Sequence, residues 1–131
     1  MAAIYLDSSA AVALILDEPG AVALGEFLQL WSEPVSSALA RVETIRAVNR
    51  APSSERRVRA LALLARLSLI SISNEIVEHA AQLTPAKLRS LDAVHVATAL
   101  SIPRLGGMVV YDQRLAEAAE ANGLRVFMPG R

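Results

Sequence analysis

Short apolar runs alternate along this chain with longer segments in which apolar side chains recur at helical spacing. The short runs predict buried strands at residues 2–6, 33–37, 69–72, 108–111 and 124–127. The longer segments predict helices at residues 10–16, 21–31, 38–50, 55–67, 74–83, 90–100 and 113–121. Strands that alternate with helices predict an α/β protein, a three-layer α/β/α fold with a central, mostly parallel sheet of four to five strands.

The composition indicates one domain with an aliphatic core. The chain has 131 residues, 53% of them hydrophobic and only 4% aromatic, so Ala, Leu, Val and Ile must build the core. Such a core suits helices packed on a buried parallel sheet. We therefore expect a single domain over residues 1–131.

Cysteine is absent, which excludes disulfides, Cys-ligated zinc and a thiol nucleophile. Any metal ligands must then be oxygens or imidazoles. Acidic residues interrupt the apolar runs well short of a membrane span, and no basic stretch precedes the first run. We expect a soluble, cytoplasmic protein with no membrane partner.

Four acidic residues, Asp7, Glu43, Asp92 and Asp112, lie next to apolar segments far apart in the chain. A carboxylate beside a core needs a partner, and no lysine accompanies any of the four. Asp7 and Asp112 follow predicted strands, whose carboxyl ends form the ligand-binding edge of a parallel sheet. We expect all four to converge on a hard divalent cation, Mg²⁺ or Mn²⁺.

Arginines are concentrated in the middle of the chain, although the formal net charge is zero. The segment from Arg41 to Arg66 holds seven of the 13 basic residues against Glu43 and Glu55. Arginine favours bidentate contacts with phosphate, so this segment is a candidate RNA-facing surface. An ordinary solvated helix face remains the alternative.

Asp92 and His95 lie three residues apart on one face of the predicted helix 90–100. Taken alone, Asp92 is also explained as an acid that the helix dipole stabilises in a first turn. His95 could act as a general acid or base, but an interior histidine bonded to the backbone or a carboxylate is favoured. Ser9 is expected to cap the first helix, and His79 receives no role.

Four motifs in order resemble those of PIN-domain ribonucleases, and more narrowly the VapC toxins of bacterial and archaeal toxin–antitoxin pairs. They are IYLDSSA at 4–10, LARVE at 39–43, LDAVHVATA at 91–99 and VYDQRL at 110–115. The third is the most specific, and the resemblance covers nearly the whole chain.

The resemblance implies an endoribonuclease that depends on Mg²⁺ or Mn²⁺ and cleaves RNA phosphodiester bonds through an activated water. It implies that Asp7, Glu43, Asp92 and Asp112 are the catalytic metal ligands, with the Ser9 hydroxyl beside the metal site. The family often carries Thr or Ser where this chain has Val110, so a hydroxyl that could orient Asp112 is missing.

The resemblance also implies a small VapB-like antitoxin partner and a homodimer. The helices at 10–16 and 21–31 and the arginine-bearing helices at 38–67 are candidate antitoxin surfaces. The candidates for steering the RNA backbone toward the acids are Arg41, Arg46 and Arg50.

Two other functions compete with this interpretation. A phospho-accepting receiver domain needs two adjacent acids early in the chain and a late strand-end lysine, but Ser8 follows Asp7 and the only lysine is Lys87. A catalytically inactive PIN-like module that binds RNA or a protein remains open, and the retention of all four acids argues against it.

Overall fold

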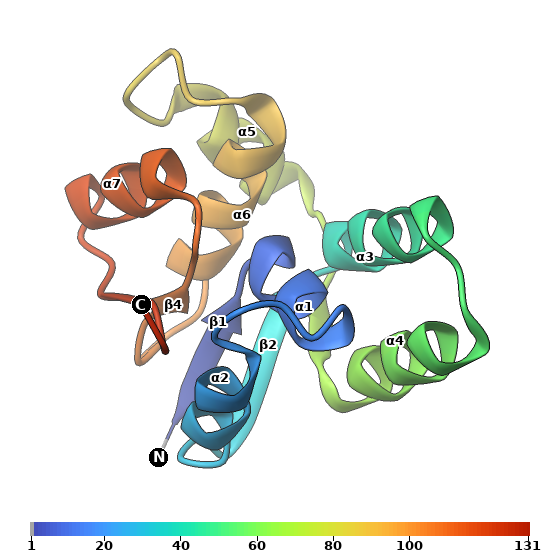
Figure 1. Cartoon of the computed structure of the whole chain (residues 1–131). Helices are drawn as coiled ribbons and strands as arrows, with labels where there is room; N and C mark the ends of the chain where they lie inside the picture. Colours follow the sequence, from blue (N-terminus) through green and yellow to red (C-terminus); the bar gives the residue numbers. More distant parts are fainter. Residues whose placement is uncertain (1) are drawn as a thin grey trace.

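The computed structural model describes residues 2–131 and has a parallel sheet between two layers of helices (Figure 1). The strands are β1 (Ala3–Leu6), β2 (Glu33–Ser37), β3 (Ser68–Ile70), β4 (Met108–Val109) and β5 (Val126–Phe127). The helices are α1 (Ser8–Ile15), α2 (Ala21–Leu28), α3 (Leu39–Arg50), α4 (Ser54–Arg66), α5 (Asn74–Gln82), α6 (Ser90–Leu100) and α7 (Gln113–Ala121). The predicted three-layer α/β/α class is confirmed.

The sheet has the order β3-β2-β1-β4-β5, and every strand pairs in parallel. The chain therefore begins in the centre, builds one half of the sheet and then crosses to the other side of β1. Tyr5 in β1 pairs with Val35 of β2 and Met108 of β4. The strand order reverses at β1, and a ligand site is expected at the carboxyl ends there.

Side-chain alternation along β1 explains why the sheet is covered on both faces. Ala3 and Tyr5 belong to a core cluster with residues of α6 and α7. Ile4 and Leu6 belong to a second cluster with residues of α1, α2 and α4. A strand buried on both faces reads as a continuous apolar run, which is the pattern at the N-terminus of the sequence.

Most boundaries of the predicted elements shift by a few residues. Helix α2 ends at Leu28, short of the predicted Trp31, and β3 ends at Ile70, short of the predicted residue 72. Strands β4 and β5 are also shorter than predicted. Strand ends depend on which neighbours supply hydrogen-bond partners, and hydrophobic pattern alone does not contain that information.

Trp31 packs against the core cluster on the α2 side and closely approaches a glycine. A Cβ on Gly106 would lie 2.0 Å from the Trp31 ring carbon Cζ3. Position 106 is therefore glycine because the indole occupies the space that a side chain would need.

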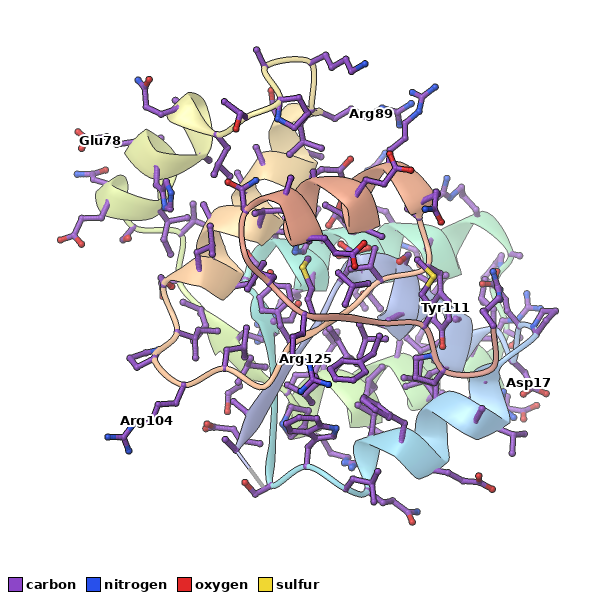
Figure 2. All side chains as sticks on the ribbon, turned by 90° about the vertical axis from the view of Figure 1, so that its left-hand side faces the viewer. Asp17, Glu78, Arg89, Arg104, Tyr111 and Arg125 are labelled. Atoms are coloured by element: carbon purple, nitrogen blue, oxygen red, sulfur yellow. The ribbon has the colours of Figure 1, made fainter. Side chains whose placement is uncertain are left out.

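The segment after β5 folds back toward the residue that precedes Asp112. The Tyr111 hydroxyl donates to the Pro129 carbonyl over 2.8 Å, and the Arg131 guanidinium lies 4.8 Å from the Tyr111 ring centroid. Figure 2 shows Tyr111 beside the C-terminal segment. Within residues 2–131, no helix combines the length and apolar character that crossing a bilayer requires.

Candidate active site

Asp7 lies at the carboxyl end of β1, where the strand order reverses. Its backbone N–H donates to the Val109 carbonyl over 3.1 Å, which joins it to the end of β4. Its side chain caps α1, since Oδ2 accepts hydrogen bonds from the Ser9 N–H (3.1 Å) and the Ser9 hydroxyl (2.7 Å). The predicted cap at Ser9 is therefore wrong: Asp7 is the cap, and Ser9 fixes the Asp7 carboxylate.

Glu43, in the second turn of α3, reaches across to α1 and α6. Its Oε1 accepts a hydrogen bond from the Ser8 hydroxyl over 2.5 Å and lies 2.7 Å from His95 Nε2. Burial acts to raise the pKa of the Glu43 carboxyl, but the His95 and Ser8 hydrogen bonds outweigh it, so the pKa lies below its usual value. Glu43 is thus held as a carboxylate.

His95 is buried, with 1% of its surface exposed, and both ring nitrogens are engaged. Nδ1 lies 2.6 Å from the Tyr5 hydroxyl, and Nε2 lies 3.7 Å from Asp7 Oδ1 in addition to its contact with Glu43. Burial acts to lower the pKa of His95, but the Glu43 hydrogen bond and the surrounding negative charges raise it above its usual value. The prediction of an interior histidine bonded to a carboxylate is confirmed.

Asp92 lies in the first turn of α6, half-buried. Burial raises the pKa of its carboxyl, and the charges of Asp7 and Asp112 raise it further. Like charges raise a carboxyl pKa only at short range, so these side chains share one electrostatic environment. The charges of Asp7, Asp112 and Glu43 thus all act on Asp92, which is what convergence of the four acids predicts.

Asp112 is exposed and serves as the N-cap of α7. Its Oδ1 accepts hydrogen bonds from the backbone N–H groups of Arg114 (2.8 Å) and Leu115 (3.2 Å). Val110, two residues earlier, is fully buried in the core cluster of β1 and α7, so it offers no polar contact to Asp112. The charge of Asp112 raises the pKa of Asp92, but the hydrogen bonds of its carboxylate are those of the α7 cap and not of the group around His95.

The donor set fits a hard divalent cation in chemistry and charge, because it consists of carboxylate oxygens that repel one another. In the part of the chain that the structure describes, no group of three or more such side chains is arranged to hold an ion. One oxygen of Glu43 and one of Asp112 are hydrogen-bonded within the protein, which leaves the second oxygen of each for an ion. Because no three of these side chains surround a common position, coordination by all four acids would require some of them to reorient.

The three arginines proposed to steer RNA are all exposed on α3. A helical rotation of about 100° per residue places Arg46 and Arg50 within about 60° of Glu43, and Arg41 about 160° away. Arg46 and Arg50 therefore share the face that carries Glu43, and Arg41 faces away from it.

Sequence reasoning missed Tyr5 and Ser8, which hold His95 and Glu43 from two sides. Tyr5 resembles any other apolar strand residue, so the pattern gave no sign of its polar contact. Ser8 can be recognised in the sequence as a residue at the start of a helix next to Asp7, but its partner Glu43 is 35 positions away.

Sequence reasoning also missed three cations that line a cavity together with Asp92 and Asp112. These cations are Lys87, Arg89 and Arg114.

Comparison with known proteins agrees with this geometry. Residues 4–121 match the family model described as PIN domain. The chain belongs to the PIN-domain family.

The similarity to individual proteins extends over nearly the full length. The chain is 43% identical to Ribonuclease VapC46 of Mycobacterium tuberculosis over 98% of its length and 99% of that protein. It is 44% identical to Ribonuclease VapC35 of the same organism over 98% of both chains. The resemblance to VapC-type PIN domains noted from the motifs is confirmed.

A solved structure shares the fold at lower identity. The crystal structure of VapBC2 from Rickettsia felis bound to a promoter DNA fragment superposes with a TM-score of 0.75. It is 15% identical and covers 95% of this chain and 97% of its own. This likeness supports the arrangement of strands and helices.

Proposed function

We propose that this single PIN-like domain, residues 1–131, is an endoribonuclease that hydrolyses RNA phosphodiester bonds and depends on Mg²⁺ or Mn²⁺. The observation that carries the proposal is geometric: Asp7 and Glu43 both contact His95 of α6, and Asp92 in the first turn of the same helix lines one cavity with Asp112. The relatives named above are ribonucleases by name, which agrees with this chemistry.

Asp7, Glu43, Asp92 and Asp112 would hold the ion. A divalent ion bound there would supply a stronger water nucleophile and neutralise charge on the phosphate oxygens. The Ser9 hydroxyl would keep Asp7 oriented, and Ser8 and His95 would keep Glu43 ionised and in place. With both nitrogens engaged, His95 acts by positioning Glu43, not as an acid or base.

Arginines on α3 would draw the RNA backbone toward the acids. Without a cation, four carboxylates repel phosphate, so approach of RNA requires both a loaded site and positive charge beside it. Arg46 and Arg50 have the geometry for this role because they share the Glu43 side of α3, and Arg41 would contribute to the field from the opposite side.

The protein would act as the toxin of a toxin–antitoxin pair in the cytoplasm, with a VapB-like antitoxin as partner and a homodimer as its assembly. The solved relative is a VapBC complex by its description. Of the helices predicted as antitoxin surfaces, α2, α3 and α4 would receive it, since they carry exposed apolar side chains, whereas the residues of α1 are buried or half-buried. The exposed side chains are Val22, Val42, Val58 and Leu61.

The test is incubation of purified protein with single-stranded RNA and Mg²⁺ or Mn²⁺, with and without chelator. Cleavage that the chelator abolishes, and that added metal restores, supports the proposal. Cleavage that persists in chelator would refute the metal dependence. RNA binding without cleavage under every metal condition would favour the inactive RNA-binding module.

A further inference from the structure

A cavity of about 1070 Å³ opens between the loop that precedes α6 and helix α7. Asp92 and Asp112 line it together with Lys87, Arg89 and Arg114. None of the roles assigned above uses these three cations.

The three cations are exposed and available to a ligand. Across residues 2–131 the ion pairs are Arg59 with Glu55 and those of His95, so Lys87, Arg89 and Arg114 form no ion pair with a carboxylate. An arginine without a carboxylate partner keeps its planar set of donors free for phosphate.

Two helix N-termini also lie at this cavity. Helix α6 begins after Arg89, whose side chain makes no capping hydrogen bond, and α7 begins after Asp112. The backbone N–H groups at a helix start carry partial positive charge and favour anions. Because Asp112 already caps α7, the start of α6 is the more open of the two.

The charge of the cavity depends on the state of the acids. Asp92, Asp112 and Glu117 balance the three cations, so the metal-free cavity has no net attraction for a polyanion. A divalent cation held by Asp92 and Asp112 would offset their charge and leave the lining of the cavity with a net positive charge. Binding of RNA in this cavity is therefore coupled to loading of the site.

Resting on the proposed nuclease function, we infer that this cavity is a binding channel for the RNA strand on one side of the scissile phosphate, with Arg89 and Arg114 contacting backbone phosphates. The strand crosses the acids from here toward Arg46 and Arg50 on α3. Lys87, at the outer rim, adds a third contact.

The experiment compares two matched pairs of substitutions. The test variant is Arg89→Gln with Arg114→Gln. The control is Arg104→Gln with Arg125→Gln, since these exposed arginines precede β4 and β5 and so lie at the amino ends of the strands, away from the acids. Figure 2 shows Arg89 and Arg104 at opposite ends of the molecule. Each variant removes two positive charges and breaks none of the ion pairs found within residues 2–131, and the control also gives up the contact of Arg125 with the Phe127 ring.

Binding of a labelled single-stranded RNA is measured by fluorescence anisotropy against salt concentration, in Ca²⁺ and in chelator, with the RNA checked for integrity. In Ca²⁺ the test variant should lower the slope of log affinity against log salt by about 1.4, because each phosphate that is no longer neutralised reduces the slope by about 0.7. The control should keep the wild-type slope. A wild-type slope in the test variant, or an equal reduction in the control, would overturn the inference.

Steady-state cleavage separates this inference from the proposed function. In Mg²⁺ the test variant should raise KM and leave kcat near wild type, because it removes binding shared by substrate and transition state. If the wild-type protein cleaves no RNA, the nuclease proposal is wrong, and the salt dependence of RNA binding alone then tests the channel. Normal cleavage with KM unchanged in the test variant would reject the channel alone.

Discussion

The Tyr5 hydroxyl lies 2.6 Å from Nδ1 of His95, on the side of the imidazole opposite Glu43. Tyr5, a core residue of β1, thus positions the His95 ring, and this ring in turn positions the Glu43 carboxylate. Burial raises the Tyr5 pKa strongly, so the phenol stays protonated beside the ring. The orientation of Glu43 therefore depends on a residue that never reaches solvent.

Tyr5→Phe removes this support without changing the shape of the core. We expect a loss of about 1–3 kcal/mol in unfolding free energy, because His95 Nδ1 is left buried without a partner. Cleavage should fall through kcat with little change in KM. The control is Tyr111→Phe, which also removes one hydroxyl hydrogen bond, to Pro129, and should keep kcat. Urea unfolding and steady-state kinetics measure both, and equal kcat decreases in the two variants would contradict a positioning role.

Asp7→Asn should abolish cleavage while keeping metal-free stability near wild type. Asn caps helices as well as Asp and still accepts from Ser9, and the loss of attraction to His95 opposes the relief of repulsion from Asp92. Asp7→Ala should abolish cleavage and also cost about 0.5–2 kcal/mol through removal of the cap. Thermal unfolding in chelator distinguishes the two variants. A clear drop in the Tm of Asp7→Asn would show that the Asp7 charge itself stabilises the fold.

The Glu43–His95 contact should make metal-free stability depend on pH. The folded pKa of His95 is raised, so its contribution is present below its ordinary value of 6.5 and is lost as pH rises through the folded pKa. The folded pKa of Glu43 is lowered, so its contribution is present above its ordinary value of 4.5 and is lost as pH falls through the folded pKa. The stabilising contributions of His95 and Glu43 are therefore both present between pH 4.5 and pH 6.5.

We therefore expect the Tm difference between wild type and Glu43→Gln, measured in chelator, to be largest between pH 4.5 and 6.5 and to shrink on either side. Subtraction of the variant removes most of the separate effect of Asp92, because burial and the charges of Asp7 and Asp112, the main causes of its raised pKa, act in both proteins. A difference that stays constant from about pH 4 to about pH 9 would contradict the pairing.

The arginines of α3 should differ in their effect on RNA. Arg46→Ala with Arg50→Ala should raise KM and lower the salt slope, because these side chains share the Glu43 face. Arg41→Ala should have the smaller effect per charge removed. Cleavage rates over a salt series test this order, and a larger effect from Arg41 would place the RNA on another face of α3.

Two glycines make a matched pair for stability. Gly106→Ala should destabilise the protein severely, because the new Cβ would meet the Trp31 ring at 2.0 Å. Gly25→Ala, in the middle of α2 with nothing within 4 Å of its Cβ position, should stabilise it by about 0.5–1 kcal/mol. Urea midpoints measure both, and a stable Gly106→Ala variant would show that the indole can move aside.

Asp7 and Asp112 illustrate what sequence can provide. Each follows an apolar run directly, so local pattern alone placed both at strand carboxyl ends. The inclusion of Glu43 and Asp92 needed the argument that buried carboxylates require partners. The sheet order and the Tyr5 contact with His95 were out of reach, because both depend on packing between segments far apart in the chain.

The elements that supply the carboxylates are spread along the chain, from α1 to the start of α7. Asp112 lies at the start of α7, and β5, which completes the sheet beside β4, follows it along the chain. Proteolysis within the segment between α6 and α7 would separate Asp112 and Arg114 from Asp7, Glu43 and Asp92. A single cut there would therefore disconnect one acid from the other three without removing any residue of the protein.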